Sequence, residues 1–186
     1  INFESLKSNS KQKLQFVYIK ATEGKNYRDK KFESNYINAK NANLKIGVYH
    51  FFRFNVSGKQ QALNLVEAIS NKEIDLPIAI DIEKWGNKKA NKSIVINAVN
   101  EFIETLKSNG YTRTVIYSNE DGYKTYLKNN FSENDLWICS FNTQFTKNNQ
   151  WKFWQYSHKG KIIGAEGYID YNVFNGSVDQ WNEYID

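Results

Sequence analysis

Short apolar runs alternate with longer amphipathic stretches along most of this chain, and this alternation restricts its fold more than any other feature. Runs rich in β-branched and aromatic residues, typical of buried strands, occur at 14–21, 45–52, 77–83, 113–118 and 136–141. Helical spacing of apolar residues occurs at 31–44, 57–70 and 92–110, and a short helix is expected around 120–129. Strands that alternate with helices in this order usually pair in parallel.

The ends of two predicted helices carry recognisable signals. Ser57 is a typical N-cap, and the helix at 92–110 is expected to open at Ser93 and to stop at Gly110. After residue 141 the helical pattern disappears, and 151–157, 161–164 and 167–174 look like closely spaced strands. The pattern predicts an α/β fold, an irregular TIM-like barrel with a final all-β portion. An open doubly wound sheet is the alternative.

Composition indicates one domain and a ligand with flat faces. A length of 186 residues fits a single domain, 1–186, and no repeat or linker interrupts it. The 12 Tyr, 12 Phe and 5 Trp offer more aromatic surface than packing alone usually requires, and such faces bind sugars and bases. The net charge of +5 attracts polyanions, which include nucleic acid, anionic lipid and cell-wall polymers.

Metal and membrane chemistry find little support in the sequence. Cys139 is the single cysteine and lies in an apolar run, so a buried, inert thiol is expected. His50 and His158 are the only histidines, and no ligand-spaced cluster surrounds them, so no metal or cofactor is predicted. No run approaches the roughly 18 apolar residues of a membrane span, and residues 1–11 lack a signal-peptide pattern. We therefore expect a soluble chain.

Polar residues gather where the predicted strands end. The strand ends read KATEG (20–24), YHFFRF (49–54), DIE (81–83), YSN (117–119), WQYS (154–157) and YIDYN (168–172). In parallel barrels the ends of successive strands meet at one face, and catalytic groups sit there. A purely structural sheet has no need for this convergence of acids, aromatics and amides.

Asp81 and Glu83 are the most informative pair among these residues. Their i, i+2 spacing on a strand points both side chains to the same face, roughly 6.5–7 Å apart at the backbone. Neighbouring carboxylates resist simultaneous ionisation, and apolar surroundings raise a carboxyl pKa further. One acid can therefore stay protonated near neutral pH, as a glycosidic leaving group requires. A solvated strand end and magnesium ligands are the alternatives.

The sequence resembles the glycoside hydrolase family 25 lysozymes, the Chalaropsis-type muramidases. The motifs that carry the resemblance are FVYIKATEG (16–24) with Tyr27 and Asp29, IGVYHFF (46–52), PIAIDIE (77–83), GYTRTVIYSN (110–119), LWICSF (136–141), and WKFWQYS followed by YIDYNVFNGS. They span nearly the whole chain in the family's order. The resemblance implies a (β/α)5(β)3 barrel.

The resemblance also implies an activity and a phage endolysin-like catalytic domain. The expected reaction is hydrolysis of the β-1,4 bond between N-acetylmuramic acid and N-acetylglucosamine in bacterial peptidoglycan. Glu83 matches the family's proton donor, Asp81 the neighbouring acid that orients the 2-acetamido group or stabilises charge on it, and Asp170 a further active-site carboxylate. The acetamido oxygen is expected to act as the internal nucleophile, as in substrate-assisted family 18 enzymes. Those enzymes carry a further Asp where this chain has Ala79, which argues against a family 18 chitinase.

Supporting roles are assigned to residues at the other strand ends. Trp154, Tyr156 and Tyr117 are expected to stack on sugar faces, with a place in the core as the alternative for each. Tyr49 and His50 lie at a strand end, and a lone His in YHFF is more often structural than an acid or base. Glu23 bears either on the site or on the KATEG turn, and Arg53 pairs with one of the acids.

The resemblance breaks at the N-terminal end of the sequence. The family begins with a G-x-D-x-S strand, whereas this chain begins INFESLK, and its first acid, Glu4, falls in what resembles the following helix. The first barrel strand is therefore expected to be missing. An unpaired edge strand invites exchange with another molecule, so a strand-exchanged oligomer is a further expectation.

Three functions remain to be compared. The first is the muramidase, acting on the cell wall and, as an endolysin, made in the cytoplasm of a phage's host. The spore-cortex hydrolases and autolysins carry the same domain. The second is a non-catalytic peptidoglycan-binding module on a degenerate hydrolase scaffold. The third, a nucleic-acid-binding domain, has only charge and aromatic content behind it. Neither nucleic acid nor membrane is expected as a partner.

Overall fold

A computed structural model of the chain describes residues 1, 14–161 and 164–185. Its strands are β1 (Phe16–Glu23), β2 (Tyr27–Arg28), β3 (Lys45–Phe51), β4 (Ile78–Asp81), β5 (Thr114–Asn119), β6 (Asp135–Cys139), β7 (Phe153–Gly160) and β8 (Ile169–Phe174). Its helices are α2 (Phe32–Asn41), α3 (Gly58–Ile69), α4 (Lys92–Ser108), α5 (Glu120–Gly122), the π-helical turn η1 (Tyr123–Leu127), α6 (Thr143–Lys147) and α7 (Val178–Ile185).

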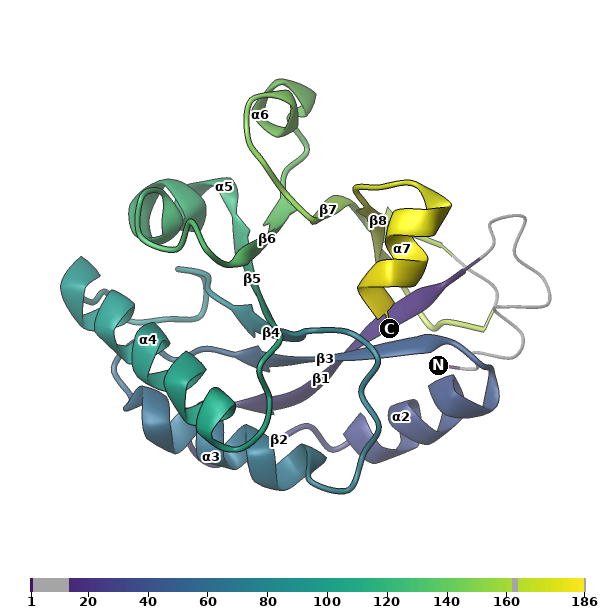
Figure 1. Cartoon of the computed structure of the whole chain (residues 1–186), viewed down its shortest axis with the longest axis horizontal. Coiled ribbons are helices and arrows are strands. Elements are labelled where there is room, and N and C mark those ends of the chain that lie inside the picture. The colour runs from purple at the N-terminus through teal and green to yellow at the C-terminus, as the bar shows by residue number, and fades with distance from the viewer. Residues whose placement is uncertain (2–13, 162–163, 186) are drawn as a thin grey trace.

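All of these strands belong to one curled sheet, in the order β2-β1-β3-β4-β5-β6-β7-β8 (Figure 1). The strands from β1 through β3 to β7 run parallel, and β2 and β8 are antiparallel to their neighbours. The predicted α/β class and barrel-like curl are confirmed. Within the described ranges no strand pairs with the free edge of β8 or with residues 16–20 of β1 on the side away from β3. Among the described residues a seam therefore separates β1 from β8. Glu4 lies outside the described residues.

Helices cover the outer face of the sheet, where the larger of the two hydrophobic clusters lies. Figure 1 shows α2, α3 and α4 on the outside of β1, β3 and β4. Leu65 of α3 and Val99 of α4 are fully buried there, in the same hydrophobic cluster as Ile80 of β4. Ser57 caps α3 as predicted, since its side chain accepts a hydrogen bond from the Gln60 N–H. For α4 the cap is Asn91, two residues before the predicted start, because its side chain accepts the Ser93 N–H.

Aromatic rings fill the inner face of the curl. Tyr18 of β1 packs on Trp137 of β6 with 4.5 Å between ring centroids. Trp181 of α7 lies 5.2 Å from Phe16, measured between centroids, at the end where the parallel strands begin. The Tyr184 hydroxyl donates to Asp135 Oδ2 at 2.7 Å. Helix α7 therefore covers this end of the barrel. The opposite end, where the parallel strands end, remains open for a site.

The C-terminal third corrects the prediction that only strands follow residue 141. Helices α6 and α7 have five and eight residues, too few for a helical period to be visible in the sequence. The predicted strand at 161–164 is not confirmed at either described end, because Lys161 and Gly164 lie outside the strands. Residues 162–163 fall outside the described part. The predicted helix at 120–129 is present as α5 and η1.

Candidate active site

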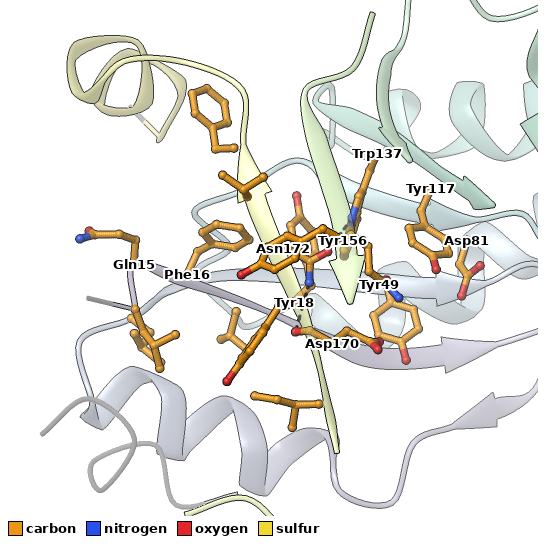
Figure 2. Close-up of a pocket in the computed structure, with 18 of the residues that line it drawn as sticks. Gln15, Phe16, Tyr18, Tyr49, Asp81, Tyr117, Trp137, Tyr156, Asp170 and Asn172 are labelled. Atoms are coloured by element: carbon orange, nitrogen blue, oxygen red, sulfur yellow. Dashed lines mark hydrogen bonds between the residues drawn. The ribbon is translucent and has the colours of Figure 1, made fainter. Parts of the chain in front are cut away.

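A cavity of about 890 Å³ opens on the inner side of the curled sheet. Residues of both seam strands line it, and it runs from the open end of the barrel down to α7. Figure 2 shows Asp81 and Tyr117 toward one end of this cavity, and Gln15 and Phe16 toward the other. The predicted convergence of strand ends therefore produces a real cavity.

Asp81 and Glu83 both line this cavity, as their spacing predicted. Asp81 is the last residue of β4. Ile82 between them is fully buried in the hydrophobic core on the opposite side. This alternation places the two carboxyls on the inner face, because successive side chains of an extended segment point to opposite sides. Asp170 lines the same cavity from β8, whose antiparallel direction brings its start to the open end.

The Asp81 carboxyl is buried without a complete set of partners. Asp81 is only 8% exposed, and its Oδ1 has no hydrogen-bond partner among the described residues. Burial raises the pKa of Asp81 well above its usual range, and the neighbouring Glu83 raises it further. Lys20, which also lines the cavity, acts in the opposite direction. A buried carboxyl oxygen without a hydrogen-bond partner is rare in native proteins, so this one calls for an explanation.

Glu83 is less buried and is held from two sides. Its Oε1 accepts a hydrogen bond from Asn119 Nδ2 at 3.1 Å. Its backbone carbonyl accepts one from Asn87 Nδ2 at 2.9 Å. Burial raises the pKa of Glu83, the Asn119 hydrogen bond partly offsets this, and the charge of Asp170 adds to the rise. A fixed carboxyl with a raised pKa, open to a cavity, suits a general acid.

Asp170 completes a group of three carboxyls around the open end of the cavity. Partial burial raises the pKa of Asp170, and His158 lowers it. Figure 2 shows Asp170 beside the ring of Tyr49. Burial, together with the charges of Asp81 and Asp170, raises the pKa of Tyr49, so this phenol stays protonated and can donate a hydrogen bond.

Three of the predicted aromatic contacts lie in the cavity wall and one does not. Tyr49, Tyr117 and Tyr156 line the cavity. Tyr156 does so because the register of β7 and β8 shifts between Gln155 and Ser157, which breaks the alternation of the strand. Trp154 is not in the lining: its indole N–H donates to the Ser140 carbonyl at 2.7 Å, and its ring packs edge-on against Trp151. Trp154 is thus outside this cavity, and the sugar contact expected of it stays a prediction.

The expected place of His50 in the substrate site is wrong, because this residue lies on the helix-covered face of the sheet. Its side chain is 0% exposed, and it does not line the cavity. Thr22 Oγ1 lies 2.7 Å from Nδ1, and Gln61 Oε1 lies 3.1 Å from Nε2. Burial lowers the pKa of His50 to about 4, so the ring is neutral. His50 is a structural residue and cannot touch a substrate there.

Glu23 holds the turn after β1, the alternative weighed for it above. Lys20 Nζ lies 2.7 Å from Glu23 Oε2, and Arg53 pairs with Oε1 of the same carboxylate. These two cations lower the pKa of Glu23 despite its partial burial. Glu23 does not line the cavity. Its ion pair holds Lys20, and Lys20 does line the cavity.

Several lining residues were not singled out from the sequence. Lys20, Trp85, Trp137, Gln155 and Asn172 line the cavity beside the acids. Trp85 is 77% exposed and follows Glu83 by two residues, a position the DIEKW motif could have flagged. Trp137 is held by its indole N–H, which donates to Asn172 Oδ1 at 2.9 Å. Asn119 was visible only as the last letter of YSN.

Metal-binding groups and membrane-spanning helices are both absent from the described ranges 1, 14–161 and 164–185. There, no group of three or more His, Cys, Asp or Glu side chains could hold a metal ion. No helix of those ranges has the length and apolar character of a membrane span. Burial raises the pKa of Cys139 to about 11, so its thiol is protonated at neutral pH.

Comparisons with known proteins agree with this arrangement. The model of the glycosyl hydrolases family 25 matches residues 1–165. The chain is 33% identical over 96% of its length to Lysozyme M1 of Streptomyces globisporus, and 31% identical over 94% to the uncharacterized protein YegX of Escherichia coli strain K12. It spans 65% and 64% of these relatives, respectively, so less than two thirds of each. A family 25 glycosyl hydrolase structure from Bacillus anthracis superposes with a TM-score of 0.89 at 32% identity, over 100% of this chain and 88% of that one. The chain belongs to glycosyl hydrolase family 25.

Proposed function

We propose that this chain is a peptidoglycan hydrolase, an N-acetylmuramidase that cleaves the β-1,4 bond between N-acetylmuramic acid and N-acetylglucosamine. The observation that carries the proposal is the pair Asp81 and Glu83, two carboxyls of raised pKa in one cavity with aromatic walls. Family membership supports it, as do relatives named Lysozyme M1 and autolytic lysozyme, the latter from Clostridium acetobutylicum. Bacterial peptidoglycan is the proposed substrate and the cell wall the proposed place of action.

Glu83 is the proposed proton donor. Its Oε2 carries no hydrogen bond to the described residues, whereas Oε1 is held by Asn119. In the first step the Oε2 proton moves to the glycosidic oxygen while the bond from that oxygen to C1 of the muramic acid breaks. In the second step water attacks C1, and the Glu83 carboxylate takes the proton that the water releases.

Asp81 is the proposed partner of the substrate's 2-acetamido group. The acetamido oxygen attacks C1 as the leaving group departs, so a C1–O bond forms and an oxazolinium ion results. The role assigned to the Asp81 carboxyl, which lines the cavity, is to accept the acetamido N–H and to balance the positive charge of that ion. Water then opens the ring at C1. Two displacements at C1 give a product that retains the β configuration.

A non-catalytic peptidoglycan-binding module is the second candidate function. The observation that favours it is the seam between β1 and β8, which leaves one wall of the cavity without a strand among the described residues. Both candidates predict binding to peptidoglycan. They differ in whether new reducing ends appear.

Mass spectrometry of borohydride-reduced fragments separates these functions. Purified peptidoglycan is digested with the wild-type chain and with Glu83→Gln, which keeps the shape of the side chain and removes its acid. Reduced muramic acid ends from the wild type alone would support the muramidase with Glu83 as its acid. Reduced glucosamine ends would overturn the proposed bond specificity. Binding without new ends from either protein would leave the binding module as the function.

A further inference from the structure

The junction between β5 and α5 is fastened to the end of β4 at three points. Ser118 Oγ donates to the Ile82 carbonyl at 2.6 Å, and Asn119 Nδ2 donates to Glu83 Oε1 at 3.1 Å. A Cβ at Gly122 would stand 2.2 Å from Ser118 Oγ and 2.9 Å from the Ile82 carbonyl oxygen. Only glycine lets the first turn of α5 come this close. The closeness sets the position of Asn119 relative to Glu83.

The orientation of the Asn119 amide is fixed by its second hydrogen bond. Asn119 is the N-cap of α5, and its Oδ1 accepts the Gly122 N–H at 2.9 Å. A backbone N–H can only donate, so the atom that faces it must be the amide oxygen. The NH₂ group is then turned toward Glu83. The cap of one short helix thereby presents a donor to the carboxyl in the cavity.

We propose that Asn119 is a positioning residue for Glu83, which keeps the acidic proton on Oε2 and that oxygen facing the cavity. The inference rests on the proposed role of Glu83 as proton donor. An N–H donor to Oε1 favours a carbonyl character at that oxygen, because a protonated Oε1 would meet the amide hydrogen. The proton therefore resides on Oε2, which no described residue binds. The Glu83 side chain does not have to rotate, and its proton does not have to move to the other oxygen, before the proton is transferred to the substrate.

Other charged or titratable groups also act on Glu83 and must be counted in any test. The charge of Asp170 on β8 raises the pKa of Glu83. The charge of Glu83 in turn raises the pKa values of Asp81 on β4, Tyr49 on β3, Tyr117 on β5 and Cys139 on β6. None of them donates a hydrogen bond to the Glu83 carboxyl in the described part of the chain. Asn119 is thus distinct in kind from these neighbours.

Two variants separate the cap from the donor. Asn119→Ser and Asn119→Asp both keep an oxygen that can accept the Gly122 N–H, since Ser and Asp are good N-caps. Neither offers an N–H to Glu83, and Asp adds a negative charge beside it. Asn91→Ser and Asn91→Asp are the matched controls, because Asn91 caps α4 in the same manner without contact to an acid.

The primary measurement is a carbon NMR titration of the Glu83 carboxyl, assigned with Glu83→Gln. We expect both Asn119 variants to raise the pKa of Glu83, Asp more than Ser, and both Asn91 variants to leave it in place. On peptidoglycan, kcat should fall about tenfold or more with little change in KM, and the alkaline limb of the rate profile should move to higher pH. The variants should unfold at the wild-type temperature.

An unchanged pKa of Glu83 in folded Asn119→Ser and Asn119→Asp would overturn the inference. Failure of both to fold would do the same, because Asn119 would then be a structural residue. The titration does not depend on turnover. A shifted pKa in a chain that releases no peptidoglycan fragments would refute the proposed function and leave the positioning role intact.

Discussion

His50 and Asp81 lie on neighbouring strands, are both almost completely buried, and have opposite surroundings. In the ladder of β3 and β4, His50 pairs with Ile80 and Phe51 pairs with Asp81. His50 faces the helices, where both ring nitrogens have partners. Asp81 faces the cavity, where Oδ1 has none among the described residues. A shift of one residue along the paired strands changes the face to which a side chain points. The polar group on the helix-covered face has all its hydrogen-bond partners, and the one on the cavity face does not.

The difference shows how this fold separates scaffold from site. Buried polar groups in native proteins are nearly always satisfied, so each exception calls for an explanation. The His50 network fixes its own tautomer: the Arg53 N–H also donates to Gln61 Oε1, so that oxygen must be an acceptor and Nε2 of His50 a donor. Thr22 then donates to Nδ1. The Asp81 carboxyl lacks such a complete set of hydrogen bonds, as is expected of a group that binds substrate.

The largest effect should come from breaking the completed network. His50→Ala removes partners from the buried Thr22 and Gln61 side chains and leaves a cavity, so the free energy of unfolding should fall by about 4 kcal/mol. Urea unfolding followed by circular dichroism measures it. His158→Ala, at the chain's other and exposed histidine, is the control and should change stability by less than about 0.5 kcal/mol. Equal losses in both variants would contradict the structural role of His50.

The two groups should also respond to pH with opposite signs. The pKa of His50 is lowered from 6.5 to about 4 in the folded chain, so below pH 6.5 the unfolded chain binds the proton first. The stability that His50 contributes is therefore lost as pH falls from 6.5 to about 4, by up to about 3 kcal/mol. The measurement is the difference in unfolding free energy between wild type and His50→Gln, which should narrow over that range. A constant difference would count against a neutral, buried ring.

A smaller effect is expected at the rim of the incomplete site. Trp85→Ala should raise KM for peptidoglycan about fivefold, because an exposed indole beside Glu83 gives a sugar a face worth about 1 kcal/mol. The melting temperature should stay unchanged, since 77% of Trp85 is exposed. Tyr168→Ala, at an aromatic that is 61% exposed but outside the cavity lining, is the matched control. Steady-state kinetics on soluble peptidoglycan fragments would show whether only Trp85 matters.

The sequence allowed the fold class and the cavity acids to be predicted. It did not show to which face of a strand each of the other side chains points. The alternation of Asp81, Ile82 and Glu83 is regular, so their shared face could be predicted. The sequence could not show that Tyr156 lines the cavity and Trp154 does not, because the register shift after Gln155 has no sequence signal. For His50, a second shift between Lys20 and Thr22 on β1 has the same effect, since it decides which side chain of that strand meets the ring.

Asn119 illustrates a different limit. Its contact with Glu83 joins residues 36 positions apart and depends on Gly122 packing against β4. Such a contact follows from tertiary packing alone. Helix α7 was missed for a related reason, because Trp181 and Tyr184 stabilise it through the barrel interior instead of through a long helical pattern.

The most direct test of this account measures stability and activity together in Asp81→Asn. The raised pKa of Asp81 means that the folded chain binds its proton more tightly than the unfolded chain, so this carboxyl lowers stability as pH rises above 3.8. We predict that Asp81→Asn melts at a higher temperature than the wild type at neutral pH, by a margin that shrinks on acidification. Its rate of peptidoglycan hydrolysis should fall at least about a hundredfold. A lower melting temperature, or an unchanged rate, would contradict the claim that Asp81 lacks a partner in the protein and interacts with the substrate instead.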